Sequence, residues 1–257
     1  MDYNYHTHTY LCSHATGEIE DYIKTAIENG IKYMGFSEHF PLRFENGVQS
    51  GYRLMVEDVD FYFSTLYGLR EKYKDKIDIK IGFEMEYYPA LFDEMVNNAK
   101  KYGGEYLILG QHFPSPEYLK SSKYVIIPEE SANALEDYVS GVVEGIKSGV
   151  FTYVAHPDIL NFVGDKDLYR ESFVKICEAS KEYNVPLEIN FFGIRDNRNY
   201  PDMRFVELLG ETKAPVTFGF DSHTVKDAFD GNSLKIAKEW VEKYKLNYIG
   251  KPNIIEL

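Results

Sequence analysis

Short apolar runs alternate with longer amphipathic segments along nearly the whole chain. A short apolar run bounded by turn residues is typical of a buried strand, and apolar positions spaced by three or four residues are typical of a helix. The apolar runs predict seven strands, near residues 2–6, 32–37, 78–84, 105–110, 151–155, 186–190 and 216–220. The amphipathic segments predict helices near residues 18–29, 56–75, 90–102, 129–148, 169–184, 203–210 and 232–245.

The order of these elements predicts stacked βα units. Gly30 and Gly149 follow two of the predicted helices, where a glycine commonly ends a helix. No linker rich in Ser, Gly or Pro divides the chain, so we expect residues 1–257 to form a single domain. Seven βα units in a chain of 257 residues predict an α/β fold, a distorted (β/α)7 barrel related to the TIM barrel, with its active site at the C-terminal ends of the strands. An open doubly wound sheet is the alternative.

The charge balance narrows the possible partners. Lys and Arg number 28 against 41 Asp and Glu, so the formal net charge is −13, which opposes binding to a phosphate backbone. We therefore expect no nucleic-acid partner. The apolar runs are far shorter than the ~20 residues that span a bilayer, so we also expect no membrane association. No heptad or long apolar stripe marks an interface, and the oligomeric state stays open.

The N-terminus and the cysteines favour a cytoplasmic location. Residues 1–5 lack the basic and apolar regions of a secretory signal, and Cys12 and Cys177 are too few for a disulfide framework. We assign Cys12 no role, because a small packed side chain is its simplest interpretation.

All seven histidines follow or end a predicted strand. They are His6, His8, His14, His39, His112, His156 and His223. Because the C-terminal strand ends of a βα barrel meet on one face, these imidazoles should form one cluster.

Carboxylates occupy other strand ends. Glu84 and Glu86 end the third predicted strand, Glu188 lies in the sixth and Asp221 follows the seventh. Imidazole and carboxylate groups are ligands suited to Zn²⁺, Mn²⁺ and Fe, and the cluster contains more of them than one ion can use. Glu84 is the best candidate to bridge two ions, whereas Glu38, Glu86 and Glu188 are each equally compatible with a functional or a structural role.

Several short motifs carry a family resemblance. They are His6-Thr7-His8-Thr9, Gly35-Phe36-Ser37-Glu38-His39, Gly82-Phe83-Glu84-Met85-Glu86-Tyr87, Gln111-His112, Ala155-His156-Pro157-Asp158 and Gly219-Phe220-Asp221-Ser222-His223. In this order they resemble the polymerase and histidinol phosphatase (PHP) family over nearly the whole chain. Residues 37–42, 84–87, 188–190 and 193–195 resemble its histidinol-phosphate phosphatase branch, and Phe191-Phe192 departs from that branch at the pocket wall.

The resemblance implies a distorted seven-unit barrel that holds up to three divalent metal ions. One ion would be bound by His6, His8, Glu84 and Asp221. A second would share Glu84 and add His112 and His156. A third would use His14, His39 and His223.

Such a centre suits phosphate monoester hydrolysis, and the resemblance implies L-histidinol phosphate as the small-molecule substrate. We expect a hydroxide that bridges the two ions sharing Glu84 to attack phosphorus. Arg195, in the loop after the sixth strand, is the first choice to clamp the phosphate, and Arg198 is the second. The leaving alkoxide needs a proton from a strand-end acid or imidazole, for which Asp221 and His39 are the candidates.

The residues that contact the rest of the substrate are not identified, and other functions remain as alternatives. Glu86, Glu117 or Asp158 could meet the substrate amine, and the long loop over residues 40–54 could cover the site. The alternative enzyme is a PHP-type phosphoesterase that acts on phosphotyrosine or nucleotide phosphates. A metal-binding protein without catalysis is the alternative from a different class.

Overall fold

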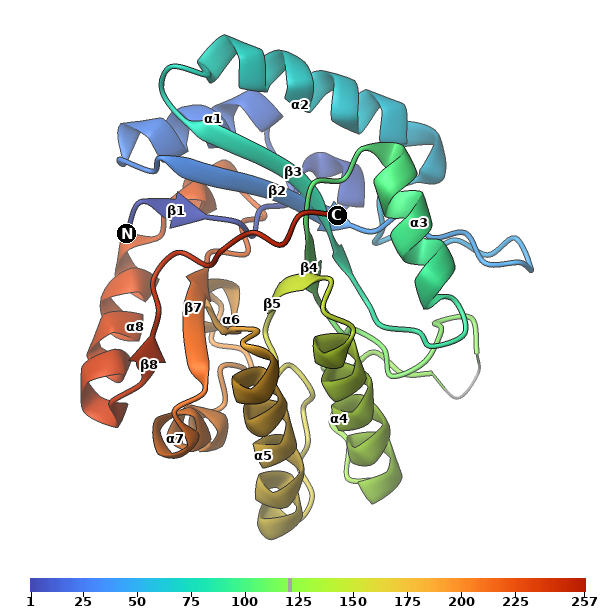
Figure 1. Ribbon diagram of the computed structural model, residues 1–257, viewed down its shortest axis with the longest axis vertical. Coiled ribbons are helices and arrows are strands. Elements are labelled where there is room, and N and C mark those ends of the chain that lie inside the picture. The colour runs from blue at the N-terminus through green and yellow to red at the C-terminus, as the bar shows by residue number, and fades with distance from the viewer. Residues whose placement is uncertain (120–121) are drawn as a thin grey trace.

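The sheet follows the predicted alternation of strands and helices. The computed structural model describes residues 1–119 and 122–257. Within these ranges, eight parallel strands form one sheet in sequence order (Figure 1). The strands are β1 Tyr3–Asn4, β2 Tyr33–His39, β3 Asp78–Met85, β4 Leu107–Leu109, β5 Phe151–Val154, β6 Leu187–Asn190, β7 Pro215–Gly219 and β8 Asn247–Tyr248.

The α-helices lie outside the curved sheet (Figure 1). They are α1 Ile19–Glu28, α2 Val59–Tyr73, α3 Phe92–Tyr102, α4 Ala132–Lys147, α5 Lys166–Tyr183, α6 Phe191–Arg195, α7 Met203–Thr212 and α8 Gly231–Tyr244. Three 3₁₀ turns, η1 Tyr10–Cys12, η2 Val56–Asp58 and η3 Val225–Ala228, are placed in the loops of the described chain. The sequence pattern missed α6 because this helix has only one turn and begins directly after β6.

Local sequence explains where several helices begin. The side chains of Ser131, Asp165 and Asp230 accept hydrogen bonds from backbone N–H groups in the first turns of α4, α5 and α8. These N–H groups have no partner within the helix, so an acceptor at the preceding position stabilises the start. Gly30 and Gly149 adopt positive φ angles of 80° and 73° after α1 and α4, as predicted.

The barrel closes between the chain that follows β1 and the chain that follows β7. The N–H of His8 donates to the carbonyl of Ser222 at 3.0 Å, and the N–H of Ser222 donates to the carbonyl of His6 at 3.2 Å. A parallel bridge joins Thr7 to Ser222 at the same place. These bonds confirm the TIM-like barrel and contradict the open doubly wound alternative.

The strand count differs from the prediction by one. The short strand β8 pairs with β7, through the partners Pro215 with Asn247 and Val216 with Tyr248. A strand of two residues is too short to produce a recognisable periodicity. The prediction of a single domain over residues 1–257 is compatible with one continuous sheet and stays a prediction.

The end of the barrel opposite the predicted site is filled. Buried residues from the first, fourth and fifth strand segments form a separate cluster, which consists of Tyr3, Tyr5, Tyr106, Ile108, Tyr153 and Ala155. The C-terminal segment crosses this end (Figure 1), where Ile254 packs on the cluster and the N–H of Ile255 donates to Thr152 Oγ1 at 3.1 Å. The barrel interior is therefore closed at this end.

The helices of the described chain do not meet the requirements for a membrane span. Across the described residues, none of them combines the length and apolar character needed to cross a membrane.

Two glycines should respond in opposite ways to alanine. A Cβ on Gly82 in β3 would lie 2.2 Å from the backbone oxygen of Tyr106, whereas Gly68 in α2 has no atom within 4 Å of that position. We expect Gly82→Ala to lower the free energy of unfolding by ~1–3 kcal/mol through overpacking. Gly68→Ala should raise it by up to ~1 kcal/mol through helix propensity. Denaturant unfolding of both variants tests this, and equal effects would contradict it.

Candidate active site

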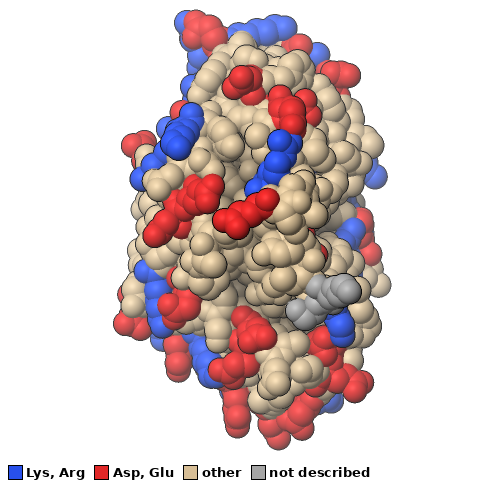
Figure 2. Space-filling view, turned by 90° about the vertical axis from the view of Figure 1, so that its right-hand side faces the viewer, with Lys and Arg blue, Asp and Glu red and all other residues tan. Residues whose placement is uncertain are grey.

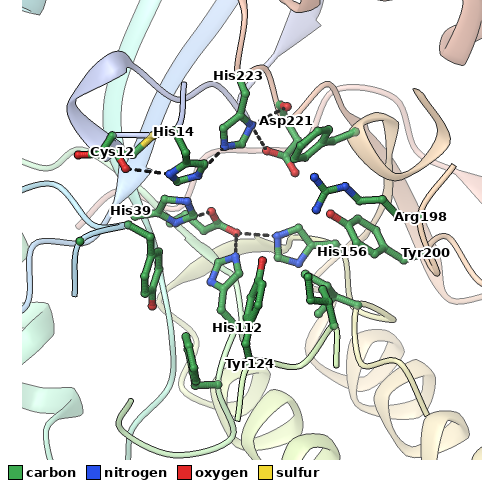
Figure 3. Close-up of a pocket in the computed structure, with 18 residues that line it drawn as sticks. Cys12, His14, His39, His112, Tyr124, His156, Arg198, Tyr200, Asp221 and His223 are labelled. Atoms are coloured by element: carbon green, nitrogen blue, oxygen red, sulfur yellow. Dashed lines mark hydrogen bonds and ion pairs between the residues drawn. The ribbon is translucent and has the colours of Figure 1, made fainter. Parts of the chain in front are cut away.

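The predicted ligands meet at a cavity at the C-terminal ends of the strands. All seven histidines, Glu84 and Asp221 lie within this one cluster. The cavity has a volume of about 570 Å³, and its wall includes His14, His39, His112, His156 and His223. Figure 3 shows these five side chains directed toward a common space, with His39 across the cavity from Arg198 and Tyr200.

Glu84 lies at the centre of the cluster. The β2–β3 register sets it beside His39, and its side chain is fully buried. Its two oxygens face imidazole nitrogens at 2.8 to 3.5 Å, which belong to His6, His8, His39, His112 and His156. One carboxylate thus contacts five imidazoles, as expected for a group placed between two ligand sets.

Asp221 is a second carboxylate that contacts several histidines. Its Oδ1 lies 3.5 Å from His6 Nε2, 3.4 Å from His8 Nε2 and 3.2 Å from His223 Nδ1. Beyond it, His223 Nε2 lies 3.0 Å from His14 Nε2. Asp221 therefore connects the cluster around Glu84 to the pair formed by His14 and His223.

The cluster fits a divalent cation because its buried donor atoms lack protein hydrogen bonds. His6 Nε2, His8 Nε2, both oxygens of Glu84 and Asp221 Oδ1 are buried without a hydrogen-bond partner. An unsatisfied buried polar atom costs ~1–3 kcal/mol, and a cation coordinated by these atoms would remove that cost. Several sets have ligand atoms within 4.8 Å of one another, among them His6, His8 and Asp221; His6, Glu84 and His156; and His8, His39 and His223.

Three further carboxylates orient imidazoles of the cluster by contacting their Nδ1 atoms. Glu38 Oε1 lies 3.1 Å from His8 Nδ1, and Glu188 Oε1 lies 2.8 Å from His6 Nδ1. Glu86 Oε1 lies 2.9 Å from His112 Nδ1. A carboxylate at Nδ1 holds the proton there and leaves Nε2 free to bind a cation, which is a common arrangement around metal-binding histidines. The sequence showed these acids at strand ends but could not show which histidine each one contacts.

The electrostatics keep the central carboxylates ionised. Burial opposes charge on Glu84, but the neighbouring His112, His6 and His156 hold its pKa well below the usual range. Burial also lowers the pKa of His6, yet Glu188, Asp221 and Glu84 outweigh it and raise that pKa to about 10. Glu84 therefore keeps its negative charge where cation binding is predicted.

Arg195 does not lie at the cavity. It ends the short helix α6 instead of lying in a loop, and its Nε and Nη1 atoms lie 3.2 Å from Asp227 Oδ1 and 3.0 Å from Asp230 Oδ2. Its Nη1 and Nη2 also donate to the backbone oxygens of Phe220 and Asp221 at 3.3 and 3.2 Å. These partners engage the guanidinium, so the geometry does not support its predicted role as the phosphate clamp.

Arg198 lies on the cavity wall. Its guanidinium carbon lies 3.9 Å from the centre of the Phe192 ring, and Phe192 stacks on His223 with ring centres 4.9 Å apart. Phe191, its neighbour, is buried against Phe218 and is not part of the cavity lining. The Phe191-Phe192 pair thus shapes the cavity through its second residue, which supports both an imidazole and an arginine.

The loop over residues 40–54 forms another wall and is held by a buried arginine. Arg53 has no exposed surface. Its Nη2 lies 2.8 Å from Glu86 Oε2, its Nε lies 2.7 Å from Glu117 Oε1, and its Nη1 donates to the carbonyl of Phe40 at 3.2 Å. The preceding residue, Tyr52, lines the cavity and donates to Glu86 at 3.0 Å. The sequence singled out the loop, but nothing in it distinguished Arg53 from Arg43.

The three acids considered for the substrate amine are engaged elsewhere. Glu86 and Glu117 pair with Arg53, as described above, and Asp158 accepts the N–H of Asp202 at 2.5 Å. Burial raises the pKa of Asp158 to about 7. Among the described residues, the cavity lining includes none of these three side chains. The prediction that one of them meets an amine in the cavity is therefore not supported.

Aromatic side chains that sequence reasoning did not assign to the site form much of the wall. Tyr52, Phe113, Tyr124 and Tyr200 all line the cavity. Tyr52, Phe113 and Tyr124 lie in loops beyond strand ends, and Tyr200 lies in the loop between α6 and α7. The chain has 22 tyrosines and 17 phenylalanines, so composition gave no means to select them.

The chain is similar to known proteins of one family. A model of the PHP domain family matches residues 4–191. The chain is 26% identical to the histidinol-phosphatase of Bacillus subtilis, over 86% of this chain and 93% of that protein. It is 22% identical to a probable histidinol-phosphatase of Deinococcus radiodurans, over 85% of each chain.

A solved structure shares the fold. The histidinol phosphate phosphatase of Lactococcus lactis, crystallised with zinc, L-histidinol and phosphate, superposes with a TM-score of 0.72 at 21% identity. The superposition covers 96% of this chain and 95% of that one.

Removing the buried arginine should destabilise the protein far more than removing an exposed one from the same loop. We expect Arg53→Gln to lower the free energy of unfolding by ~3–5 kcal/mol, because Glu86 and Glu117 would lose their buried counter-charge. The control Arg43→Gln removes a largely exposed pair with Glu57 and should cost at most ~1 kcal/mol. Denaturant unfolding measures both, and similar losses would show that the buried network is not stabilising.

Proposed function

This chain belongs to the PHP domain family, and we propose that it is a metal-dependent phosphomonoesterase that hydrolyses L-histidinol phosphate to L-histidinol and phosphate. The observation that carries the proposal is the set of buried donor atoms around Glu84 that lack hydrogen-bond partners, which opens on a cavity with Arg198 at its wall. The names of the relatives from Bacillus subtilis and Deinococcus radiodurans support the choice of substrate.

We propose that the cluster holds up to three divalent ions, of Zn, Mn or Fe. His6, His8, Glu84 and Asp221 would hold one ion. Glu84, His112 and His156 would hold a second, and His14, His39 and His223 would hold a third. When bound, such ions supply Lewis-acid stabilisation of phosphoryl charge and activation of water.

Arg198 is proposed as the phosphate-binding arginine in place of Arg195. The face of Phe192 supports its guanidinium, which can donate to two non-bridging phosphoryl oxygens. Arg195 instead acts as a positioning residue, because its Nη2 holds the backbone carbonyl of Asp221.

Asp221 and His39 are proposed to handle protons. The Nδ2 of Asn190 donates to Asp221 Oδ2 at 3.0 Å, which orients the carboxylate so that Oδ1 can take a proton from water and return it to the leaving alkoxide. Burial, together with the charge of His8, holds the pKa of His39 well below its usual range, so this imidazole is neutral and any proton that it takes up is released readily to the leaving alkoxide.

The cavity suits a small substrate with a flat ring. Its volume of about 570 Å³ is typical of sites for small molecules, and its tyrosine and phenylalanine rings can stack on an imidazole. The same aromatic lining favours a second candidate, an aryl phosphate such as phosphotyrosine. On the face in Figure 2, basic side chains are dispersed among acidic ones, an arrangement that disfavours a nucleic-acid substrate.

Phosphate release from L-histidinol phosphate tests the proposal. We expect the metal-loaded protein to hydrolyse this ester with strong preference over an aryl phosphate, and we expect a chelator to abolish turnover. Glu84→Gln should lose metal content and turnover together, because the variant removes the charge shared by two ligand sets. Turnover of the aryl phosphate alone would favour the second candidate. No turnover of either ester by protein with confirmed metal content would refute the phosphatase proposal.

Arg198→Gln should weaken phosphate binding without changing the fold. We expect kcat/KM to fall about ten- to hundredfold, since hydrogen bonds to a charged group contribute ~1.5–3 kcal/mol. Competitive inhibition by inorganic phosphate should weaken in parallel. The control Arg170→Gln removes an exposed pair with Glu211 and should leave both measurements unchanged. Normal phosphate inhibition in Arg198→Gln would assign the phosphate to another residue.

A further inference from the structure

We infer that the thiolate of Cys12 is an additional metal ligand, which binds a divalent ion together with His14 and His223. This inference rests on the proposed metal centre and revises the sequence-based interpretation of Cys12 as a packing residue. It adds a soft sulfur donor to a centre otherwise made of nitrogen and oxygen.

The position of Cys12 supports this role. Cys12 ends η1, has no exposed surface and contributes to the cavity wall. One ligand atom from each of Cys12, His14 and His223 lies within 4.8 Å of the other two. Figure 3 shows the three residues together on one side of the cavity, where segments from the two ends of the sequence meet.

The two histidines supply an independent indication of a cation. His14 Nδ1 lies 2.8 Å from the carbonyl oxygen of Cys12, and His223 Nδ1 lies 3.2 Å from that of Asp221. A carbonyl oxygen only accepts, so each Nδ1 carries a proton and donates it. The two Nε2 atoms face each other at 3.0 Å. Two nitrogens that bind one Zn²⁺ at ~2.1 Å lie about 3 Å or more apart, so this spacing suits a cation bound by both rings.

The backbone around Cys12 is held in place by contacts within the protein. Thr9 Oγ1 accepts the N–H of Leu11 at 3.3 Å at the start of η1, and it donates to Glu38 Oε2 at 2.6 Å. Glu38 also contacts His8, so η1 is tied to the main cluster. Ser13 then adopts a left-handed φ of 67°, which turns the chain between Cys12 and His14. A ligand pair on an anchored turn loses little conformational entropy when it binds an ion.

A thiolate changes which metal the position prefers. Sulfur with two imidazole nitrogens suits Zn²⁺ and Co²⁺, whereas Mn²⁺ prefers oxygen ligands. The thiol releases one proton to solvent as the metal–sulfur bond forms, so charge and atoms balance. We therefore expect zinc to be retained over manganese at this position.

Cobalt spectroscopy of the metal-free full-length protein reloaded with Co²⁺ tests the inference. A thiolate bound to Co²⁺ gives a charge-transfer absorption in the near ultraviolet, which imidazole and carboxylate ligands do not give. We expect this band in the wild type and in Cys177→Ser, whose substituted cysteine is buried in α5 away from the cavity. Cys12→Ser and Cys12→Ala should lose the band while retaining the cobalt absorption of the remaining ligands.

Metal competition gives a second measurement. Cys12→Ser should retain Zn²⁺ against Mn²⁺ about tenfold less well, or worse, in equilibrium dialysis with metal analysis. Cys177→Ser should match the wild type. An unchanged zinc preference in Cys12→Ser would overturn the inference.

Three spectroscopic results would also overturn it: a wild-type protein that binds no Co²⁺, one that binds Co²⁺ without the band, or a band that persists in both Cys12 variants. The wild-type spectrum decides even if both variants fail to fold. A protein that shows the band but hydrolyses no phosphate ester would refute the proposed function and keep the inference. Chelator-sensitive turnover without the band would support the proposed function and refute the role of Cys12 as a ligand.

Discussion

The buried charge of Glu84 is the interaction on which the site depends. A buried carboxylate carries a desolvation penalty of several kcal/mol unless opposite charge and hydrogen-bond donors surround it. Here the surrounding groups are imidazoles that follow or end β1, β2, β4 and β5, the strands on either side of β3 in the sheet, and barrel closure adds Asp221 and His223. The closing bonds of Ser222 with His6 and His8 lie within the site itself. The bonds that close the barrel therefore also bring Asp221 and His223 to the cluster around Glu84.

A second layer of charge supports the first. Glu38, Glu188 and Glu86 each hold one imidazole by Nδ1, and Arg53 in turn neutralises Glu86. Charge alternates outward from the centre, from carboxylate to imidazole to carboxylate to guanidinium. Because the last member belongs to the loop over residues 40–54, the same network that orients His112 also fixes a wall of the cavity.

Arg195 and Arg198 are close in sequence, but a turn between them places their side chains in different surroundings. Asn190 caps α6 through a hydrogen bond from the N–H of Gly193 at 3.0 Å, and the helix carries Arg195 toward Asp227 and Asp230. A positive φ of 49° at Asn197 then reverses the chain. Arg198 consequently lies over Phe192 at the cavity, although only two residues separate it from an arginine that does not line the cavity.

The sequence by itself determined the barrel class and the group of side chains that meet at one end of it. Strand and helix periodicity are local properties, and the ends of parallel strands converge whatever the helices between them contain. Glu84, Asp221 and the histidines could therefore be grouped from their positions at predicted strand ends alone. Their roles as ligands stay part of the proposed function.

Only the tertiary structure decided the contacts of those residues whose role the sequence left open. Several features depend on chain segments far apart in sequence or on a single backbone turn. They are the strand β8, the helix α6, the contacts of Arg53 and Arg195, and the position of Cys12 beside His14 and His223. Short elements produce too little periodicity to be recognised, and a side chain takes its role from the charge that faces it. No sequence spacing specifies that opposing charge, because the fold alone brings it into contact.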